Sequence, residues 1–133
     1  MAKKIQLVAR IFLGLIYFVF GGMGLAMALG LTKMPEPSLP EGATAFMTGI
    51  MATKYFFPVP KITETLGGFL LLTNVAAPLA LVVLAPVTLH ILLFNAFLIP
   101  VGGGLALPVF MVLAHITAAG AYWNLYKPLF LKH

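Results

Sequence analysis

The feature that most constrains this chain is a long stretch without charge between Thr65 and Tyr126. It contains no Asp, Glu, Lys or Arg over 62 residues, whereas one membrane-spanning helix needs only ~20 apolar residues. Of the 133 residues in the whole chain, 62% are hydrophobic and 8% are charged, which is too few charges to cover a soluble domain of this size. The sequence therefore predicts an all-α integral membrane protein that forms a single domain over residues 1–133.

The polar residues also narrow the functional class. The net charge of +5 does not indicate a nucleic-acid-binding protein, because the basic residues are few and lie mostly near the ends of apolar stretches, where they suit lipid headgroups. The absence of cysteine excludes disulfides and thiolate metal or iron–sulfur sites held by this chain alone. No metal site is predicted, and without aspartate or a Ser/His/Asp set a hydrolase is not expected. Whether the chain is an enzyme of another kind stays open.

Turn signals divide the chain into four predicted spans. The charge-free stretch from Ile11 to Leu31 is longer than the ~7–15 apolar residues of a signal peptide, so we expect a retained first span. The predicted spans are residues 5–31, 61–75, 79–99 and 107–126, with turns at 74–78 and 100–104. Residues 43–57 follow a proline-rich loop and are predicted to form an interfacial helix. The expected fold is a four-helix membrane bundle with an interfacial helix in its first extracytoplasmic loop.

Four spans would put both termini on the same side of the membrane. The basic residues divide five to three between the two sides: Lys3, Lys4, Arg10, Lys127 and Lys132 on the terminal side, and Lys33, Lys54 and Lys61 on the other. Because basic residues are enriched on the cytoplasmic side, both termini are predicted to be cytoplasmic. Arg10 then lies near the inner face, where we expect a structural role, and not in the leaflet that holds Glu64.

Glu64 is the acidic residue at the start of the long uncharged stretch. It follows Lys61 by one helical turn, so it can be a snorkelling residue paired with that lysine near the interface. It can also be a buried carboxylate at the mouth of a cavity, which accepts hydrogen bonds from a ligand or from Asn95 in the same leaflet. The sequence leaves both interpretations open, and we favour the second.

Two histidines, His90 and His115, are predicted near the membrane midplane on different spans. Together they could hold a b-type haem, but that cofactor needs a wide bundle and is not favoured here. They could instead donate hydrogen bonds to a quinone carbonyl or to another lipophilic ligand. In the simplest interpretation each histidine is neutral and bonded to a neighbouring hydroxyl or carbonyl group.

Glycines indicate which spans approach closely. Gly21, Gly22 and Gly24 lie in the outer half of the first span, and Gly67 and Gly68 lie at similar depth on the second. Small residues allow two helix backbones to come close together in a membrane. The two glycine patches are therefore predicted to touch and to have a structural role.

Two segments resemble the DoxX family of small bacterial membrane proteins. They are RIFLGLIYFVFGGMG, which begins at Arg10, and KITETLGGFLLLTNVAAPLALVVLAPVTLHILLFNAFL, which begins at Lys61. The most specific parts are the Glu64-x-x-Gly67-Gly68 motif, the run from Leu84 to Pro86 and the run from Leu93 to Asn95. Relatives often have Asn where this chain has His90 and His where it has Asn95, and their first span is often more polar than GGMGLAMAL.

The resemblance implies a four-helix bundle in the bacterial inner membrane with a loose connection to oxidoreductases. One branch of that family is linked to quinone-coupled thiosulfate oxidation and another to membrane complexes that handle oxidative stress. The function hypothesis is a membrane subunit of a redox system that binds a quinone or other lipophile through Glu64, Asn95, His90 and His115. The alternative is a non-catalytic scaffold or accessory subunit that packs in the bilayer against a larger partner or a second copy of itself.

Overall fold

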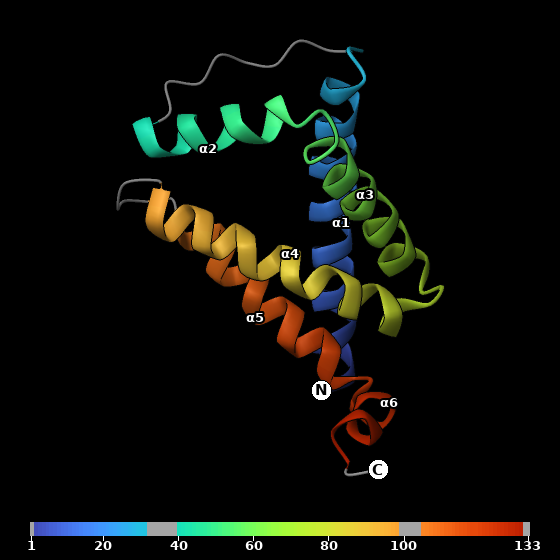
Figure 1. Ribbon diagram of the computed structural model, residues 1–133. Helices are drawn as coiled ribbons and strands as arrows, with labels where there is room; N and C mark the ends of the chain where they lie inside the picture. Colours follow the sequence, from blue (N-terminus) through green and yellow to red (C-terminus); the bar gives the residue numbers. More distant parts are fainter. Residues whose placement is uncertain (1, 32–39, 99–104, 132–133) are drawn as a thin grey trace.

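The computed structural model describes residues 2–31, 40–98 and 105–131, and every regular element within these ranges is helical. The elements are α1 (Ala2–Ala28), α2 (Glu41–Ala52), α3 (Pro58–Thr73), α4 (Ala77–Leu98), α5 (Ala106–Gly120), α6 (Trp123–Tyr126) and the short 3₁₀ helix η2 (Lys127–Phe130) (Figure 1). The all-α prediction is therefore confirmed. The predicted turn at residues 100–104 lies outside the described residues.

Two helices, α1 with 27 residues and α4 with 22, are long and apolar enough to cross a membrane. A third candidate span exists if α5 and the segment Trp123–Phe130 count as one broken span, bent by 77°. Helix α3 has 16 residues, fewer than the ~20 that a straight span needs. Large apolar side chains are exposed along α1, α3, α4 and α5, as expected where a helix surface faces lipid.

Local chemistry explains where the first helices begin and end. Helix α1 stops at Ala28, earlier than predicted, because Gly30 adopts φ +77° and the backbone N–H groups of Gly30 and Leu31 donate to Met27 and Ala26. That pair of bonds is a Schellman motif, which satisfies carbonyls at a helix end. Helix α3 begins at Pro58, where proline's fixed φ and missing N–H suit a first helical position.

The turn between α3 and α4 falls where the sequence predicted it. Asn74 ends α3 in the left-handed conformation, with φ +59°, and Ala76 has φ +51°. Asparagine tolerates this conformation better than most residues, and its backbone N–H donates to the carbonyl of Leu70. Helix α4 then runs from Ala77 through Pro86 to Leu98.

The predicted span over residues 107–126 is not one straight helix, because the chain leaves the α5 direction after Gly120. Glycine weakens a helix at that point. Beyond the bend, the Tyr122 hydroxyl donates to Asn74 Oδ1 at 3.1 Å and the Tyr126 hydroxyl donates to the Pro78 carbonyl at 2.6 Å. These two bonds hold α6 against the α3–α4 turn, so tertiary contacts outweigh the apolar pattern that favours a straight span.

Helices α1 and α3 share the most extensive contact in the described part of the chain, and they run antiparallel. Helix α5 packs on α1 and α4, and α4 also packs on α3, whereas α2 makes its main contact with α4 (Figure 1). The largest fully buried side chains come from α1, α3 and α4: Leu13, Tyr17, Leu71, Leu81 and Leu84. Met111, Ala114 and Ala118 of α5 also belong to the core, which thus forms where α1, α3, α4 and α5 meet.

Glycines permit the close approach of α1 and α3, but in a register different from the predicted one. A Cβ atom at Gly21 would lie 2.8 Å from both the Glu64 Cβ and the Thr65 backbone nitrogen, and one at Gly68 would lie 2.7 Å from the Gly14 carbonyl oxygen. Each glycine therefore meets the backbone of the facing helix and not the other glycine patch. Because the helices run antiparallel, Gly21 lies opposite Glu64 and Thr65, which are about one helical turn before Gly68 in α3.

Of the other three glycines that were predicted to touch, Gly22 meets nothing within 4 Å and two face side chains. Gly24 lies against the aliphatic part of Lys61, and Gly67 lies against Leu84 of α4. Gly67 and Gly68 differ by about 100° around the helix, so they cannot both face α1. All four of the predicted structural glycines are buried: Gly21, Gly24, Gly67 and Gly68.

We predict that Gly21→Ala destabilises the fold by about 1–3 kcal/mol, because the new methyl group would force the α1 and α3 backbones apart. Gly22→Ala is the matched control, since a Cβ at Gly22 meets nothing within 4 Å. Unfolding in detergent micelles, followed by circular dichroism, would measure both. Equal stability of the two variants would show that the close approach at Gly21 is not required.

Candidate functional site

A pocket of about 450 Å³ lies between α2, α3 and α4. Its wall is mostly apolar and aromatic: Phe46, Met47 and Ile50 from α2, Phe56 and Phe57 from the following turn, Pro60, Lys61 and Glu64 from α3, and Pro86, Val87, His90, Ile91, Phe94 and Asn95 from α4. Three of the four predicted ligand-binding residues, Glu64, His90 and Asn95, therefore border one space. Its size falls in the ~300–1,000 Å³ range of pockets that hold small molecules.

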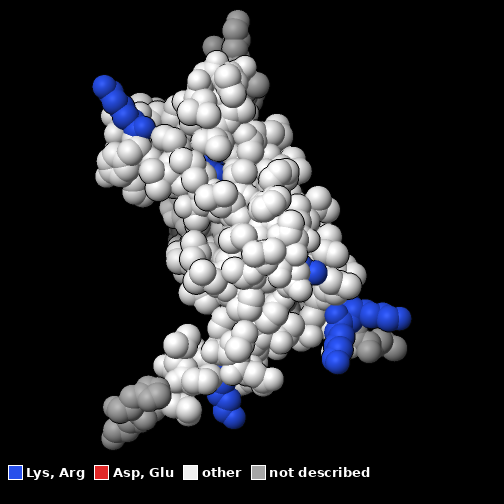
Figure 2. Space-filling model, turned by 90° about the vertical axis from the view of Figure 1, so that its right-hand side faces the viewer, with Lys and Arg blue, Asp and Glu red and all other residues white. Residues whose placement is uncertain are grey.

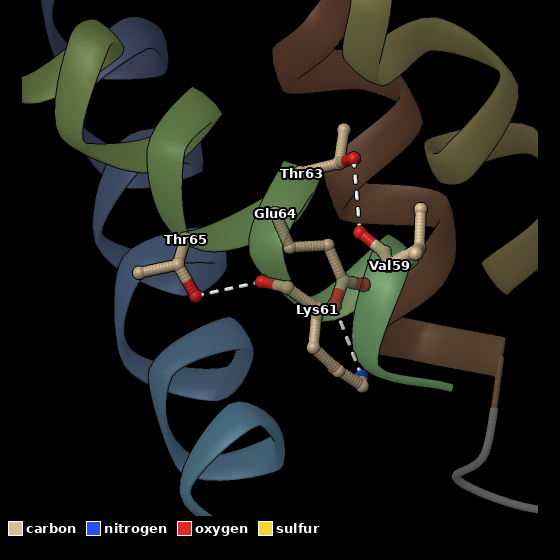
Figure 3. A network of polar contacts seen from close by, with 5 residues as sticks. All are labelled: Val59, Lys61, Thr63, Glu64 and Thr65. Carbon is tan, nitrogen blue, oxygen red and sulfur yellow. Dashed lines mark hydrogen bonds and ion pairs between the residues drawn. The ribbon is translucent and has the colours of Figure 1, made fainter. Parts of the chain in front are cut away.

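The polar end of the pocket is an ion pair on the first turns of α3. Lys61 Nζ lies 3.0 Å from Glu64 Oε2 (Figure 3). The ammonium group also lies 5.6 Å from the centre of the Phe57 ring. Glu64 is only 6% exposed. Both interpretations of this residue thus apply together: it pairs with Lys61, and it is a buried carboxylate that borders a pocket.

The ion pair leaves hydrogen-bonding capacity on the carboxylate. The Lys61 ammonium group forms an ion pair with Glu64 Oε2, but this buried oxygen receives no well-directed hydrogen bond from the described residues. The nearby hydroxyls are engaged elsewhere, because Thr65 donates to the Lys61 carbonyl at 2.7 Å and Thr63 to the Val59 carbonyl at 3.1 Å (Figure 3). The Glu64 carboxylate borders the pocket and is paired with Lys61, so it is the acidic group that the pocket wall offers to a donor on a ligand.

The α4 wall is less polar than predicted. The His90 ring is exposed and lies 5.3 Å from the Phe46 ring, which also packs 5.4 Å from Phe94. The Asn95 amide donates to the Ile91 carbonyl of its own helix at 2.8 Å. The predicted bond from Asn95 to Glu64 is therefore not formed, because the amide satisfies a backbone carbonyl one turn earlier. These aromatic contacts join α2 to α4 over the pocket.

His115 does not line this pocket, contrary to the prediction. It is buried in the core, where Nε2 lies 2.8 Å from the Leu81 carbonyl oxygen and Nδ1 lies 2.9 Å from Thr88 Oγ1. A carbonyl only accepts, so Nε2 carries the proton and Nδ1 accepts from the Thr88 hydroxyl. Tyr17 in turn donates to Thr88 Oγ1. Three helices are thus joined by a continuous hydrogen-bonded chain.

This arrangement rules out the two histidines as a facing pair. Both ring nitrogens of His115 are occupied, and His90 lies two residues after Thr88, about 200° around α4. A haem held by both histidines does not fit this geometry. Tyr17 and Thr88 were missed as partners because each is a single polar residue in an apolar stretch. Within the described residues, no three His, Cys, Asp or Glu side chains come together as a metal site.

Arg10 lies at the other end of the α1–α3 contact from Glu64. Its guanidinium donates to the Leu71 carbonyl of α3. This bond satisfies a carbonyl in the last turn of α3 and cross-links the two helices. The expectation of a structural role near the end of the bundle, apart from Glu64, matches this position.

Comparison with protein-family models, curated proteins and solved structures finds no match to this chain. The class that the geometry defines is an all-helical membrane protein with an amphipathic pocket near one end. What the pocket does is inferred below from its own residues.

We predict that Thr88→Val destabilises the protein by about 1–3 kcal/mol, because it leaves the Tyr17 hydroxyl and His115 Nδ1 without their shared partner in the core. Thr117→Val is the control, because the Thr117 hydroxyl donates to the Leu113 carbonyl of its own helix. Thermal unfolding of both variants in the same detergent would compare them. A Thr88→Val protein as stable as the control would show that the three-helix chain contributes nothing.

Proposed function

We propose that this chain is a DoxX-like four-span protein of the bacterial inner membrane, and that its α2–α3–α4 pocket binds a quinone or a similar lipophile as the membrane subunit of a redox system. The observation that carries the proposal is the combination of an apolar, aromatic wall with one buried ion pair. Apolar pockets with a few convergent polar groups are the usual form of small-molecule sites.

A quinone suits this pocket in both of its redox states. Its ring and tail fit the aromatic and aliphatic wall, and its carbonyl oxygens accept hydrogen bonds. Lys61 offers donors at one end of the pocket, and His90 offers a ring N–H on the α4 wall. The hydroxyl of a quinol can instead donate to the Glu64 carboxylate, which borders the pocket. The Lys61–Glu64 pair therefore presents a donor and an acceptor side by side.

The topology in this proposal takes α1, α3, α4 and the bent α5–α6 segment as the four spans, with α2 at the outer interface. Both termini are then cytoplasmic, on the side that carries more of the basic residues. Trp123 and Tyr126 lie at that end of the chain, where aromatic residues favour the lipid headgroup region. The short α3 is accommodated because Pro58, Lys61 and Glu64 are at its interfacial end.

The alternative is an accessory subunit that packs against a larger partner or a second copy. This alternative requires an exposed surface of small residues that a helix of the partner can approach closely. Gly21, Gly24, Gly67 and Gly68 are instead buried within the chain itself. Exposed apolar side chains elsewhere are what lipid contact requires, so they do not distinguish a partner from the bilayer.

We expect a solvent extract of gently purified wild-type protein to contain about one quinone-type molecule per chain by mass spectrometry. Glu64→Gln should lower that content about tenfold or more, because a charge-assisted hydrogen bond contributes about 1.5–3 kcal/mol. Glu41→Gln is the matched control, since Glu41 is the exposed carboxylate at the start of α2. Bulk phospholipid alone in the wild-type extract, or equal ligand in all three proteins, would contradict the proposal.

A further inference from the structure

A second pocket, of about 310 Å³, lies at the opposite end of α1 from the Lys61–Glu64 pair. Lys3, Gln6 and Arg10 line it from one face of α1, since residues spaced by three or four lie on the same side of a helix. Asn74 of the α3–α4 turn and Tyr122 of the α5–α6 bend complete its polar wall. Neither the proposed quinone site nor the core hydrogen-bonded chain uses this pocket.

The bend after α5 creates the space. Helix α5 ends at Gly120, and the chain turns there. Ala121 and Tyr122 therefore line the pocket beside α1, in place of a further turn of α5. The Tyr122 hydroxyl bond to Asn74 Oδ1 fixes the far wall. The pocket is therefore a consequence of the departure from a straight fourth span.

The charges in this pocket are not balanced by acidic residues within the described ranges. The acidic residues in the described ranges are Glu41 and Glu64, on α2 and α3, and the ion pair in these ranges joins Glu64 to Lys61. Lys3 and Arg10 thus have no carboxylate partner among the described residues. The view in Figure 2 agrees, with blue side chains gathered at the lower end of the molecule and no red visible on that face.

Hydrogen-bond donors outnumber acceptors in the pocket. One guanidinium nitrogen of Arg10 donates to the Leu71 carbonyl, which leaves other N–H groups of the five on an arginine. Asn74 Oδ1 is taken by the Tyr122 hydroxyl, so the amide nitrogen is the group that Asn74 still offers. Lys3 and Gln6 add an ammonium and an amide. A ligand must therefore be an anion with several acceptor oxygens, which describes a phosphate group.

We propose that this pocket binds the phosphate-bearing headgroup of an anionic phospholipid. Basic pockets between membrane helices are a recognised form of lipid headgroup site. Leu7 of the pocket wall is exposed, as are Ile11 and Leu125, which follow the pocket residues Arg10 and Tyr122 in the sequence, and such apolar side chains offer a surface for acyl chains. A free phosphate ion would gain nothing from that surface, so the position of the pocket favours a lipid. The quinone proposal and the headgroup proposal can each be contradicted without affecting the other, because the two pockets lie at opposite ends of α1.

The single tryptophan, Trp123, follows the pocket residue Tyr122 and reports on lipid at this position. The full chain is reconstituted with phosphatidylcholine or phosphatidylglycerol whose acyl chains carry bromine, which quenches tryptophan fluorescence on contact. We expect stronger binding of phosphatidylglycerol at Trp123. Lys3→Gln should reduce the preference about fivefold, the factor that corresponds to about 1 kcal/mol per basic residue near an anionic surface.

Lys4→Gln is the matched control, because Lys4 is exposed and adjacent in sequence but does not line the pocket. A site predicts that this control keeps its preference, whereas equal losses in both variants would mean diffuse attraction and would overturn the proposal. Arg10→Gln also removes the bond to Leu71, so its effect is interpreted only beside an unchanged circular dichroism spectrum. Inorganic phosphate tests whether the ligand is a free phosphate ion and not a lipid headgroup. If phosphate changes Trp123 emission in a Lys3-dependent way and no lipid preference is found, the lipid proposal is overturned.

Discussion

Apolar helices in lipid gain little by exchanging lipid contacts for contacts with each other, so α1 and α3 depend on how closely their backbones approach. Gly21 and Gly68 each admit the facing backbone where any larger residue would collide with it. Arg10 then ties the other end of the same contact to the Leu71 carbonyl. The approach has a direct consequence for the pocket, because it buries Glu64 against α1 and leaves its carboxylate to face Lys61 and α4.

The polar residues divide into those that the fold satisfies and those that it leaves open. Tyr17, Thr88 and His115 form one chain of donors and acceptors that ends on the Leu81 carbonyl, so the core closes on itself. Such a chain resists insertion of a ligand, since a ligand would have to replace bonds already made. Glu64 is different, because an oxygen of its carboxylate stays without a directed bond from the described residues while it borders a pocket.

The sequence was sufficient for the positions of residues along the helices but not for their directions around each helix. Charge-free length and turn residues predicted the helices, the turn at Asn74 and the separation of Arg10 from Glu64, because these follow from the rise per residue. The prediction that His115 lines the same pocket as His90 failed, since depth does not say which way a side chain points. Thr88 faces the core and His90, two residues later, faces α2. The bend at Ala121 was missed for a related reason, since only the tertiary bonds of Tyr122 and Tyr126 favour it over a straight helix.

The same reasoning explains why both proposed sites lie at the ends of the helices and not at the midplane. Within a bilayer an unsatisfied polar group costs several kcal/mol, and groups buried between the helices, such as His115 and Thr88, find partners inside the protein. Near the interface that cost falls, because water and headgroups are within reach. Polar groups therefore remain available to ligands at both ends: Lys61 with Glu64 at one end, and Lys3 with Arg10 at the other. The two ends suit ligands of different charge. A neutral lipophile that both accepts and donates suits the balanced pair, whereas only an anion suits the end where two cations have no carboxylate among the described residues.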